Sequence, residues 1–77
     1  MIKLIQISGK DFCKILEKTG FEKIFGKGSH ARFKHPDRRR TIVPIHSNEK
    51  LGKGLLIEIL KQIKITKEEY EEFRNKL

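Results

Sequence analysis

Apolar residues recur at helical spacing near the start of the chain. Ser8 followed three residues later by Asp11 is typical of a helix start, because a serine cap and an acid both suit the positive end of the helix dipole. Gly20 then occupies the usual position just past a helix end. The segment between Ser8 and Gly20 therefore predicts a short amphipathic helix whose buried face carries Phe12, Ile15, Leu16 and Thr19.

A second helical pattern begins at Leu51. Its apolar positions form one stripe, made of Leu55, Leu56, Ile59, Leu60 and Ile63. Thr66-Lys67-Glu68-Glu69 then repeats the capping signature, so we expect a last short helix that carries Tyr70 and Phe73.

Between the helical segments the pattern alternates, as it does in strands. Residues 21–25 predict a first strand and Gly26-Lys27-Gly28 a turn. Residues 29–35 predict a second strand that places two groups on opposite sides, Ala31 with Phe33 on one, and His30, Arg32 and Lys34 on the other.

Residues 35–38 (His-Pro-Asp-Arg) predict a tight turn, because proline presets the backbone angle and aspartate bonds its own local backbone. Residues 39–45 then supply a third strand. Pro44 should lie at its end or on an edge, because proline cannot donate to a ladder. The pattern leaves open whether Ile42 or Val43 faces the core.

This order of elements predicts an α+β fold, α-β-β-β-α, with a three-stranded antiparallel sheet, helices on one face and a short C-terminal helix. The other sheet face can remain in water. The arrangement resembles the double-stranded-RNA-binding fold. With 77 residues we expect a single domain over 1–77, with a small core and with any chemistry on a surface or in a shallow groove.

The charge is strongly positive and is concentrated in the middle of the chain. The formal net charge is +8, and residues 23–53 hold nine Lys or Arg against two acids, Asp37 and Glu49. Such a balance favours an anionic partner. The alternative interpretation is a solvated lysine-rich surface, but a positive cluster that surrounds a histidine favours a binding role.

The single cysteine, Cys13, cannot form an internal disulfide, which fits a reducing compartment. The apolar start of the chain is too short for a signal peptide, and no stretch approaches the ~20 apolar residues of a transmembrane helix. We therefore expect a soluble, cytoplasmic protein that does not act at a membrane.

No cofactor is expected. His30, His35 and His46 lack the partners of the usual metal motifs, so the sequence predicts no metal site. A nucleotide-binding loop follows a strand and opens a helix. The Gly-x-Gly element at Gly26 precedes a strand, and the one at Gly52 opens a helix but follows a loop, so neither fits that pattern.

His30 is the candidate catalytic residue. Histidine titrates near neutral pH (pKa ~6.5), so it can both accept and donate a proton. RNA carries its own nucleophile, the 2′-hydroxyl, and its cleavage needs a base, an acid and nearby cations but no metal. The alternative is that His30 only contacts a phosphate. His35 is expected to cap its turn or to point into the opposite layer.

Basic and polar residues around His30 are candidate RNA contacts, because such groups supply phosphate affinity that is independent of sequence. The set is Lys27, Gly28, Ser29, Arg32, Lys34, Arg38, Arg39, Arg40, His46 and Lys53. His46 could instead cap the following helix or act as a second acid–base group. Lys53 lies near a helix start, which itself attracts phosphate.

Six short elements occur in the order found in the HicA family of toxin–antitoxin mRNA interferases, which residues 8–77 resemble. They are Ser8-Gly9-Lys10, Leu16-Glu17-Lys18-x-Gly20-Phe21, Lys27-Gly28-Ser29-His30, His35-Pro36-Asp37, Val43-Pro44-x-His46 and Leu51-Gly52-Lys53-Gly54 with Ile59-Leu60-Lys61-Gln62. The departures are Leu55, where a threonine is common, and Ser47-Asn48 in place of a glycine-rich loop.

The resemblance implies a double-stranded-RNA-binding-like fold, metal-independent mRNA cleavage with His30 as the catalytic residue, and a HicB-type antitoxin that covers the active face. We therefore predict a type II toxin that acts as an endoribonuclease. The alternative is a non-catalytic RNA-binding module that uses the same face. A DNA-binding regulator fits less well, because the basic residues lie on strands and a turn and not on a recognition helix.

Overall fold

The computed structural model describes residues 4–27, 30–45 and 49–77, and for residues 25–27 it describes the backbone alone. Its elements are α1 (Gly9–Lys18), β1 (Glu22–Lys27), β2 (His30–Lys34), β3 (Arg40–Pro44), α2 (Lys53–Ile63) and α3 (Lys67–Asn75). The α+β class and the α-β-β-β-α order are thus confirmed. Gly26 and Lys27, predicted in a turn, belong to β1, because this strand continues until Lys27 pairs with His30.

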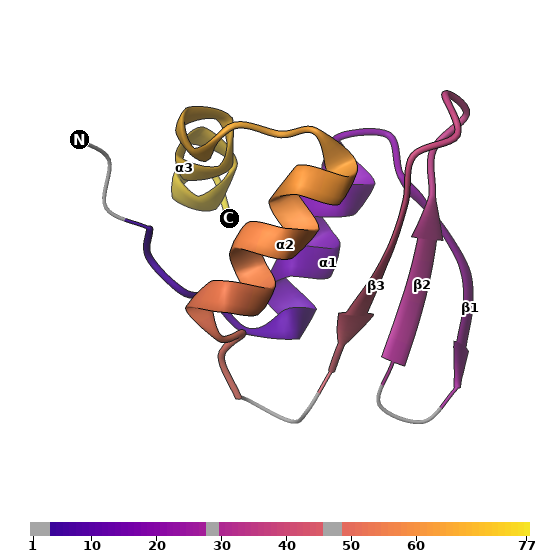
Figure 1. Cartoon of the computed structure of the whole chain (residues 1–77), viewed down its shortest axis with the longest axis horizontal. Helices are drawn as coiled ribbons and strands as arrows, with labels where there is room; N and C mark the ends of the chain where they lie inside the picture. Colours follow the sequence, from indigo (N-terminus) through magenta and orange to yellow (C-terminus); the bar gives the residue numbers. More distant parts are fainter. Residues whose placement is uncertain (1–3, 28–29, 46–48) are drawn as a thin grey trace.

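The three strands form one antiparallel sheet in the order β1-β2-β3. Helices α1 and α2 lie together on one side of it, and α3 lies beyond them, away from the sheet (Figure 1). On β2 and β3 exposed and buried residues alternate, with Ala31, Phe33, Thr41 and Val43 facing the helices. Val43 is therefore the core residue and Ile42 the exposed one, which answers the question left open by the sequence.

Local signals explain where the helices begin and end. The Ser8 side chain accepts the Asp11 backbone N–H at 3.2 Å, and Gly20 has a φ of 95°, so the predicted cap and terminator of α1 are confirmed. Thr66 and Glu69 form a complete capping box at the start of α3. Each such cap satisfies an amide of the first turn that no helical carbonyl can reach.

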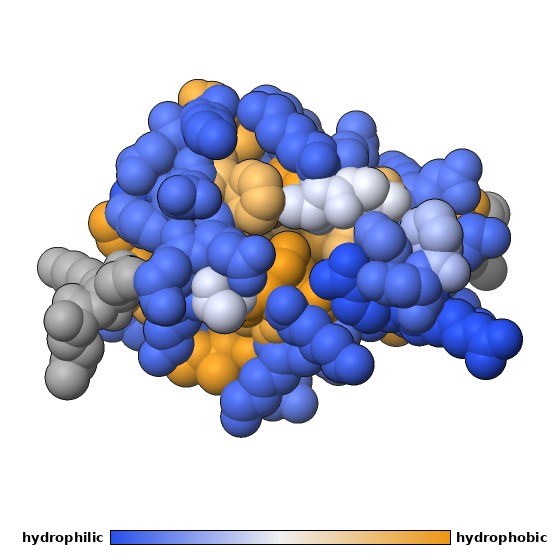
Figure 2. Space-filling model, turned by 90° about the horizontal axis from the view of Figure 1, so that it is seen from above, coloured by the Kyte–Doolittle hydropathy of each residue, from blue (hydrophilic) through white to orange (hydrophobic). Residues whose placement is uncertain are grey.

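The core runs from the covered face of the sheet through α1 and α2 to α3. Phe12, Phe33, Leu56 and Tyr70 are at most 1% exposed, and Tyr70 also donates its hydroxyl to the Ile5 carbonyl. Seen from the end where the β2–β3 turn lies, apolar surface is visible in the middle of the molecule between hydrophilic side chains (Figure 2). Leu55, predicted on the apolar stripe of α2, is instead 41% exposed.

Two close approaches hold other segments against the start of α1, one from the end of β3 and one from the chain before α2. A Cβ added to Gly9 would lie 2.2 Å from the Pro44 carbonyl oxygen, so only glycine fits there. Nearby, the Leu51 N–H donates to the Ile7 carbonyl at 2.8 Å and ties the chain before α2 to the chain before α1. Pro44 ends the edge strand, as predicted.

Candidate nucleic-acid interface

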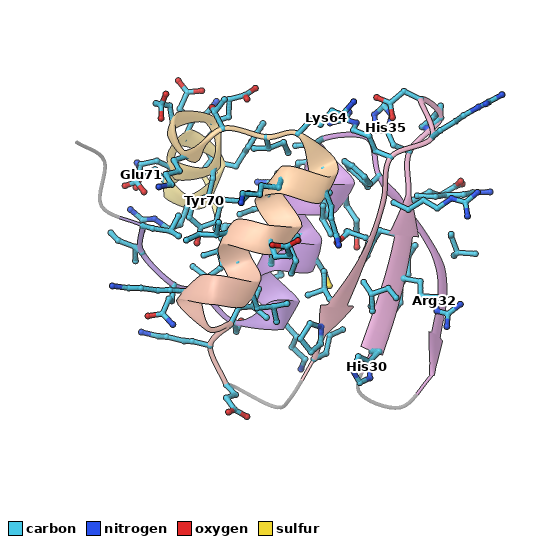
Figure 3. All side chains as sticks on the ribbon, viewed as in Figure 1. His30, Arg32, His35, Lys64, Tyr70 and Glu71 are labelled. Atoms are coloured by element: carbon cyan, nitrogen blue, oxygen red, sulfur yellow. The ribbon has the colours of Figure 1, made fainter. Side chains whose placement is uncertain are left out.

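The uncovered face of the sheet, called the open face below, carries the residues predicted to do chemistry. His30, Arg32 and Lys34 are all exposed and alternate with buried Ala31 and Phe33 along β2. Residues two apart on a strand are about 6.6 Å apart on the same side. The predicted histidine and two cations therefore form one row; Arg32 points away from the helices, and His30 lies at the end of the sheet where β2 begins (Figure 3).

Cross-strand pairing adds neighbours to this row. His30 pairs with Lys27 and Pro44, Arg32 with Phe25 and Ile42, and Lys34 with Glu22 and Arg40. Directly opposed residues on one sheet face lie about 4.5–5.5 Å apart, so Arg40 extends the positive row beside Lys34, while Glu22 offsets part of it.

His30 stands at the end of the sheet where several connections meet. It is the first residue of β2 and lies at the same end of the molecule as the start of α2, where Lys53 is exposed (Figure 1). Gly52, the N-cap residue, has no side chain with which to satisfy the first amides of α2. Gly28, Ser29 and His46, three predicted contacts, lie outside the described residues, as does the side chain of Lys27.

The three consecutive arginines of the β2–β3 turn do not share one environment. Arg38, exposed, has a φ of 80° in the turn, and Arg40 is exposed on the open face. Arg39 faces the helices: its Nε donates to Asp37 Oδ2 at 2.8 Å, its Nη1 donates to the Ile63 carbonyl, and its guanidinium lies 5.0 Å from the centre of the Phe21 ring. Its side chain is thus held away from the row on β2.

His35 caps its turn, as one of the two sequence interpretations expected. Its Nδ1 accepts the Asp37 backbone N–H at 3.2 Å and lies 2.9 Å from Asp37 Oδ1, and its ring packs edge-on against Phe21. Burial acts to raise the pKa of the Asp37 carboxyl, but the hydrogen bonds from Arg39 outweigh it and hold that pKa below its usual value. The Arg39–Asp37 ion pair is therefore kept to lower pH than an unpaired aspartate would allow, and the bond from Arg39 to the Ile63 carbonyl ties the turn to α2.

Alternation along β3 was the signal for the position of Arg39. Thr41 and Val43 face the core, so the residue two before Thr41 belongs on the same side. The run of three arginines nevertheless predicts a single basic cluster. Nothing in the spacing indicated that the Ile63 carbonyl, 24 residues later, would accept from this side chain.

Three further observations concern the Cys13 thiol, possible metal ligands and the length of the helices. Burial raises the pKa of the Cys13 thiol to about 11, so that side chain stays protonated and unreactive at neutral pH. Within the residues that the structure describes, no three His, Cys, Asp or Glu side chains gather into a group that could hold a metal ion. In the same residues, no helix is both long and apolar enough to cross a membrane.

The fold and the site define a small α+β domain with a cationic, histidine-bearing sheet face. The family model described as "HicA toxin of bacterial toxin-antitoxin" matches residues 9–65. The chain therefore belongs to the HicA toxin family, as its sequence motifs predicted. It is a toxin of a toxin–antitoxin system and has a cognate antitoxin as its partner. No curated protein matches the chain.

Proposed function

We propose that this HicA-family chain is an endoribonuclease that cleaves mRNA in the cytoplasm without a metal ion, with His30 as its acid–base residue. One observation carries the proposal: His30 is exposed on the open face in the same row as Arg32 and Lys34. A proton-transfer group beside cations is what phosphodiester transfer from the 2′-hydroxyl requires.

In the proposed reaction, the phosphorus–oxygen bond that forms and the one that breaks both belong to the RNA. A base removes the 2′-hydroxyl proton, the 2′-oxygen bonds to phosphorus, and the bond from phosphorus to the 5′-oxygen breaks as an acid protonates that oxygen. The products are a 2′,3′-cyclic phosphate and a 5′-hydroxyl. His30 supplies one of these two proton transfers, and the arrangement of the face is compatible with either.

The cations of the face have the role of holding the phosphate and its negative charge. Arg32 is the nearest to His30 along β2, and Lys34 and Arg40 follow at the far end of the row. The proposal also includes Lys27, Gly28, Ser29, Arg38, His46 and Lys53 as phosphate contacts, as the sequence predicted. It gives Arg39 the role of anchoring the turn, because its guanidinium is already engaged by Asp37 and Ile63.

The open face is also the surface that we assign to the partner. We propose that the cognate antitoxin is of the HicB type and that it covers the open face, so that RNA and antitoxin compete. The row of cations would then meet acidic groups of the antitoxin, which speeds association more than it slows dissociation.

The test is cleavage of a 5′-labelled RNA by purified wild-type chain and His30→Ala. We expect His30→Ala to cut about 10²–10⁴-fold more slowly, while its RNA affinity changes little. Cleavage by the wild type should continue in excess EDTA, leave 2′,3′-cyclic phosphate ends, and stop when the nucleotide before the cut lacks its 2′-hydroxyl.

Arg32→Ala is the matched control, because Arg32 is the next exposed residue on the same strand. It should weaken RNA binding and its dependence on salt without removing proton transfer. Products with 3′-hydroxyl and 5′-phosphate ends would exclude the mechanism. An RNA affinity without any cleavage, equal in wild type and His30→Ala, would support the non-catalytic RNA-binding module instead.

A further inference from the structure

A groove of about 780 Å³ lies along β3, away from His30, and we call it the β3 groove. Its lining comes from the open face of the sheet (Arg32 and Ile42), from the core side of β3 (Thr41) and from α2 (Leu55, Ile59 and Gln62). Within the groove, the Thr41 hydroxyl donates to the Gln62 side-chain oxygen at 2.9 Å and so joins β3 to α2.

The β3 groove gathers exposed apolar side chains. Ile24, Ile42 and Leu55 are 52%, 47% and 41% exposed, and all three line it. Single exposed apolar residues are ordinary on protein surfaces, but several in one hollow mark an interaction site. Ile24 is turned outward where the register of β1 shifts between Lys23 and Phe25, so a bulge contributes to the patch.

The rim of the groove is positive. Four exposed cations line it: Arg32, Arg38, Arg40 and Lys64. Two acids also line it, Glu58 and Asp37, and the Asp37 carboxyl is already paired with Arg39. A partner that buries apolar side chains on this floor while placing carboxylates at its edge would match both features.

The edge of β3 offers a third feature. β3 ends the strand order, and the His35 N–H to Arg39 carbonyl bond fixes which residues pair inward toward β2. Because inward and outward pairs alternate in an antiparallel ladder, the N–H and C=O of Arg40 and Ile42 point outward from the sheet. Such an edge can receive an added strand.

We propose that the β3 groove docks an extended, acidic and apolar segment of the cognate antitoxin as a fourth strand beside β3. The inference rests on the proposed function for the antitoxin's place on this chain, and it names an anchoring surface separate from His30. RNA fits the floor less well, because the exposed side chains there are aliphatic and offer no aromatic ring for bases to stack on.

The test uses Leu55→Glu with the cognate antitoxin, co-expressed in cells and purified for calorimetry. Leu55 is exposed on α2 and is not among the proposed RNA contacts. The change removes an apolar contact and opposes an acidic partner, so we expect affinity to fall by at least about 10-fold. The toxin should still arrest growth and cut RNA, but the antitoxin should no longer neutralise it fully.

Two further variants complete the design. Leu77→Glu makes the same change at an exposed leucine outside the β3 groove and should leave the complex unchanged. Glu58→Lys reverses the one exposed acid on α2 within the groove and should tighten the complex. Thermal unfolding of each free variant checks that its fold is intact.

Equal affinity for the antitoxin in wild type, Leu55→Glu and Glu58→Lys would overturn the inference. So would a Leu55→Glu chain that loses RNA binding but is neutralised normally, because the groove would then be an RNA site. If the wild type cuts no RNA, the proposed function fails, whereas the calorimetric comparison still decides whether the antitoxin uses the groove.

Discussion

The two faces of the same sheet follow opposite rules. Along β2, residues facing the helices are at most 1% exposed and apolar, whereas the intervening His30, Arg32 and Lys34 are exposed and polar. The covered face supplies stability by removing apolar surface from water. The open face carries the chemistry and little of the packing, so the two properties can be changed independently, one residue at a time.

The largest difference between the faces should appear at neighbouring residues of β2. Phe33→Ala should lower the free energy of unfolding by about 3–5 kcal/mol, because it removes a buried ring and leaves a cavity in a small core. Lys34→Ala, one residue further, should change it by less than about 0.5 kcal/mol and instead weaken RNA binding. Urea unfolding measures both. Equal losses at the two positions would contradict the division into faces.

The same division should split the arginine turn. Arg39→Ala removes the bonds to Asp37 and to the Ile63 carbonyl and should cost about 1–3 kcal/mol of stability, with little effect on RNA affinity. Arg40→Ala should leave stability nearly unchanged and lower the slope of log affinity against log salt by about 1.

Unfolding curves and RNA titrations at several salt concentrations separate these two arginines. If Arg39→Ala reduced the salt slope as much as Arg40→Ala does, Arg39 would belong to the RNA-binding set after all.

Much of this division was predictable because it follows local rules. The period-2 alternation placed His30, Arg32 and Lys34 on one side of β2, and Ser8, Gly20 and Thr66 marked helix ends through their own backbone bonds. Family motifs added the expectation that His30 is catalytic, an expectation that cleavage measurements must still test.

What the sequence did not predict depends on contacts between distant elements. Leu56, Ile59, Leu60 and Ile63 span the arc of α2 that meets the core, and Leu55 lies about 40° outside this arc at 100° per residue. A bulge in β1 is equally hidden, because one extra residue leaves the alternation ambiguous. Leu55 and the bulge both contribute to the β3 groove, so that surface could not be predicted from the sequence pattern.

Helix α3 lies on the far side of α1 and α2 from the open face (Figure 1). A change in α3 should therefore affect stability without affecting RNA cleavage. Thr66→Ala should cost about 1 kcal/mol at pH 7 through the lost cap and leave cleavage unchanged. Two hydrogen bonds from Thr66 lower the pKa of the Glu69 carboxyl; the bond from the backbone N–H has the larger effect and the side-chain bond the smaller one.

A lowered folded-state pKa stabilises the fold above the unfolded pKa, and this contribution disappears as pH falls through the folded value. Glu69→Gln should therefore flatten the acid side of the stability curve, near and below pH 4, relative to wild type. Unfolding free energies measured across this range check the prediction. A Thr66→Ala chain that folds normally but loses RNA cleavage would show that α3 is not independent of the open face.

The smallest expected effect has opposite signs on the two properties. Arg38 has a φ of 80°, in the left-handed region that costs an L-residue with a Cβ but not glycine. Arg38→Gly should therefore raise the free energy of unfolding by up to about 1 kcal/mol while it weakens RNA binding through the lost charge. Arg38→Ala is the matched control, since it removes the same charge and keeps the strained backbone. If both variants were equally stable, the turn would store no strain at Arg38; if Arg38→Gly bound RNA as tightly as wild type, the turn would lie outside the RNA path and the interface would be confined to the strands.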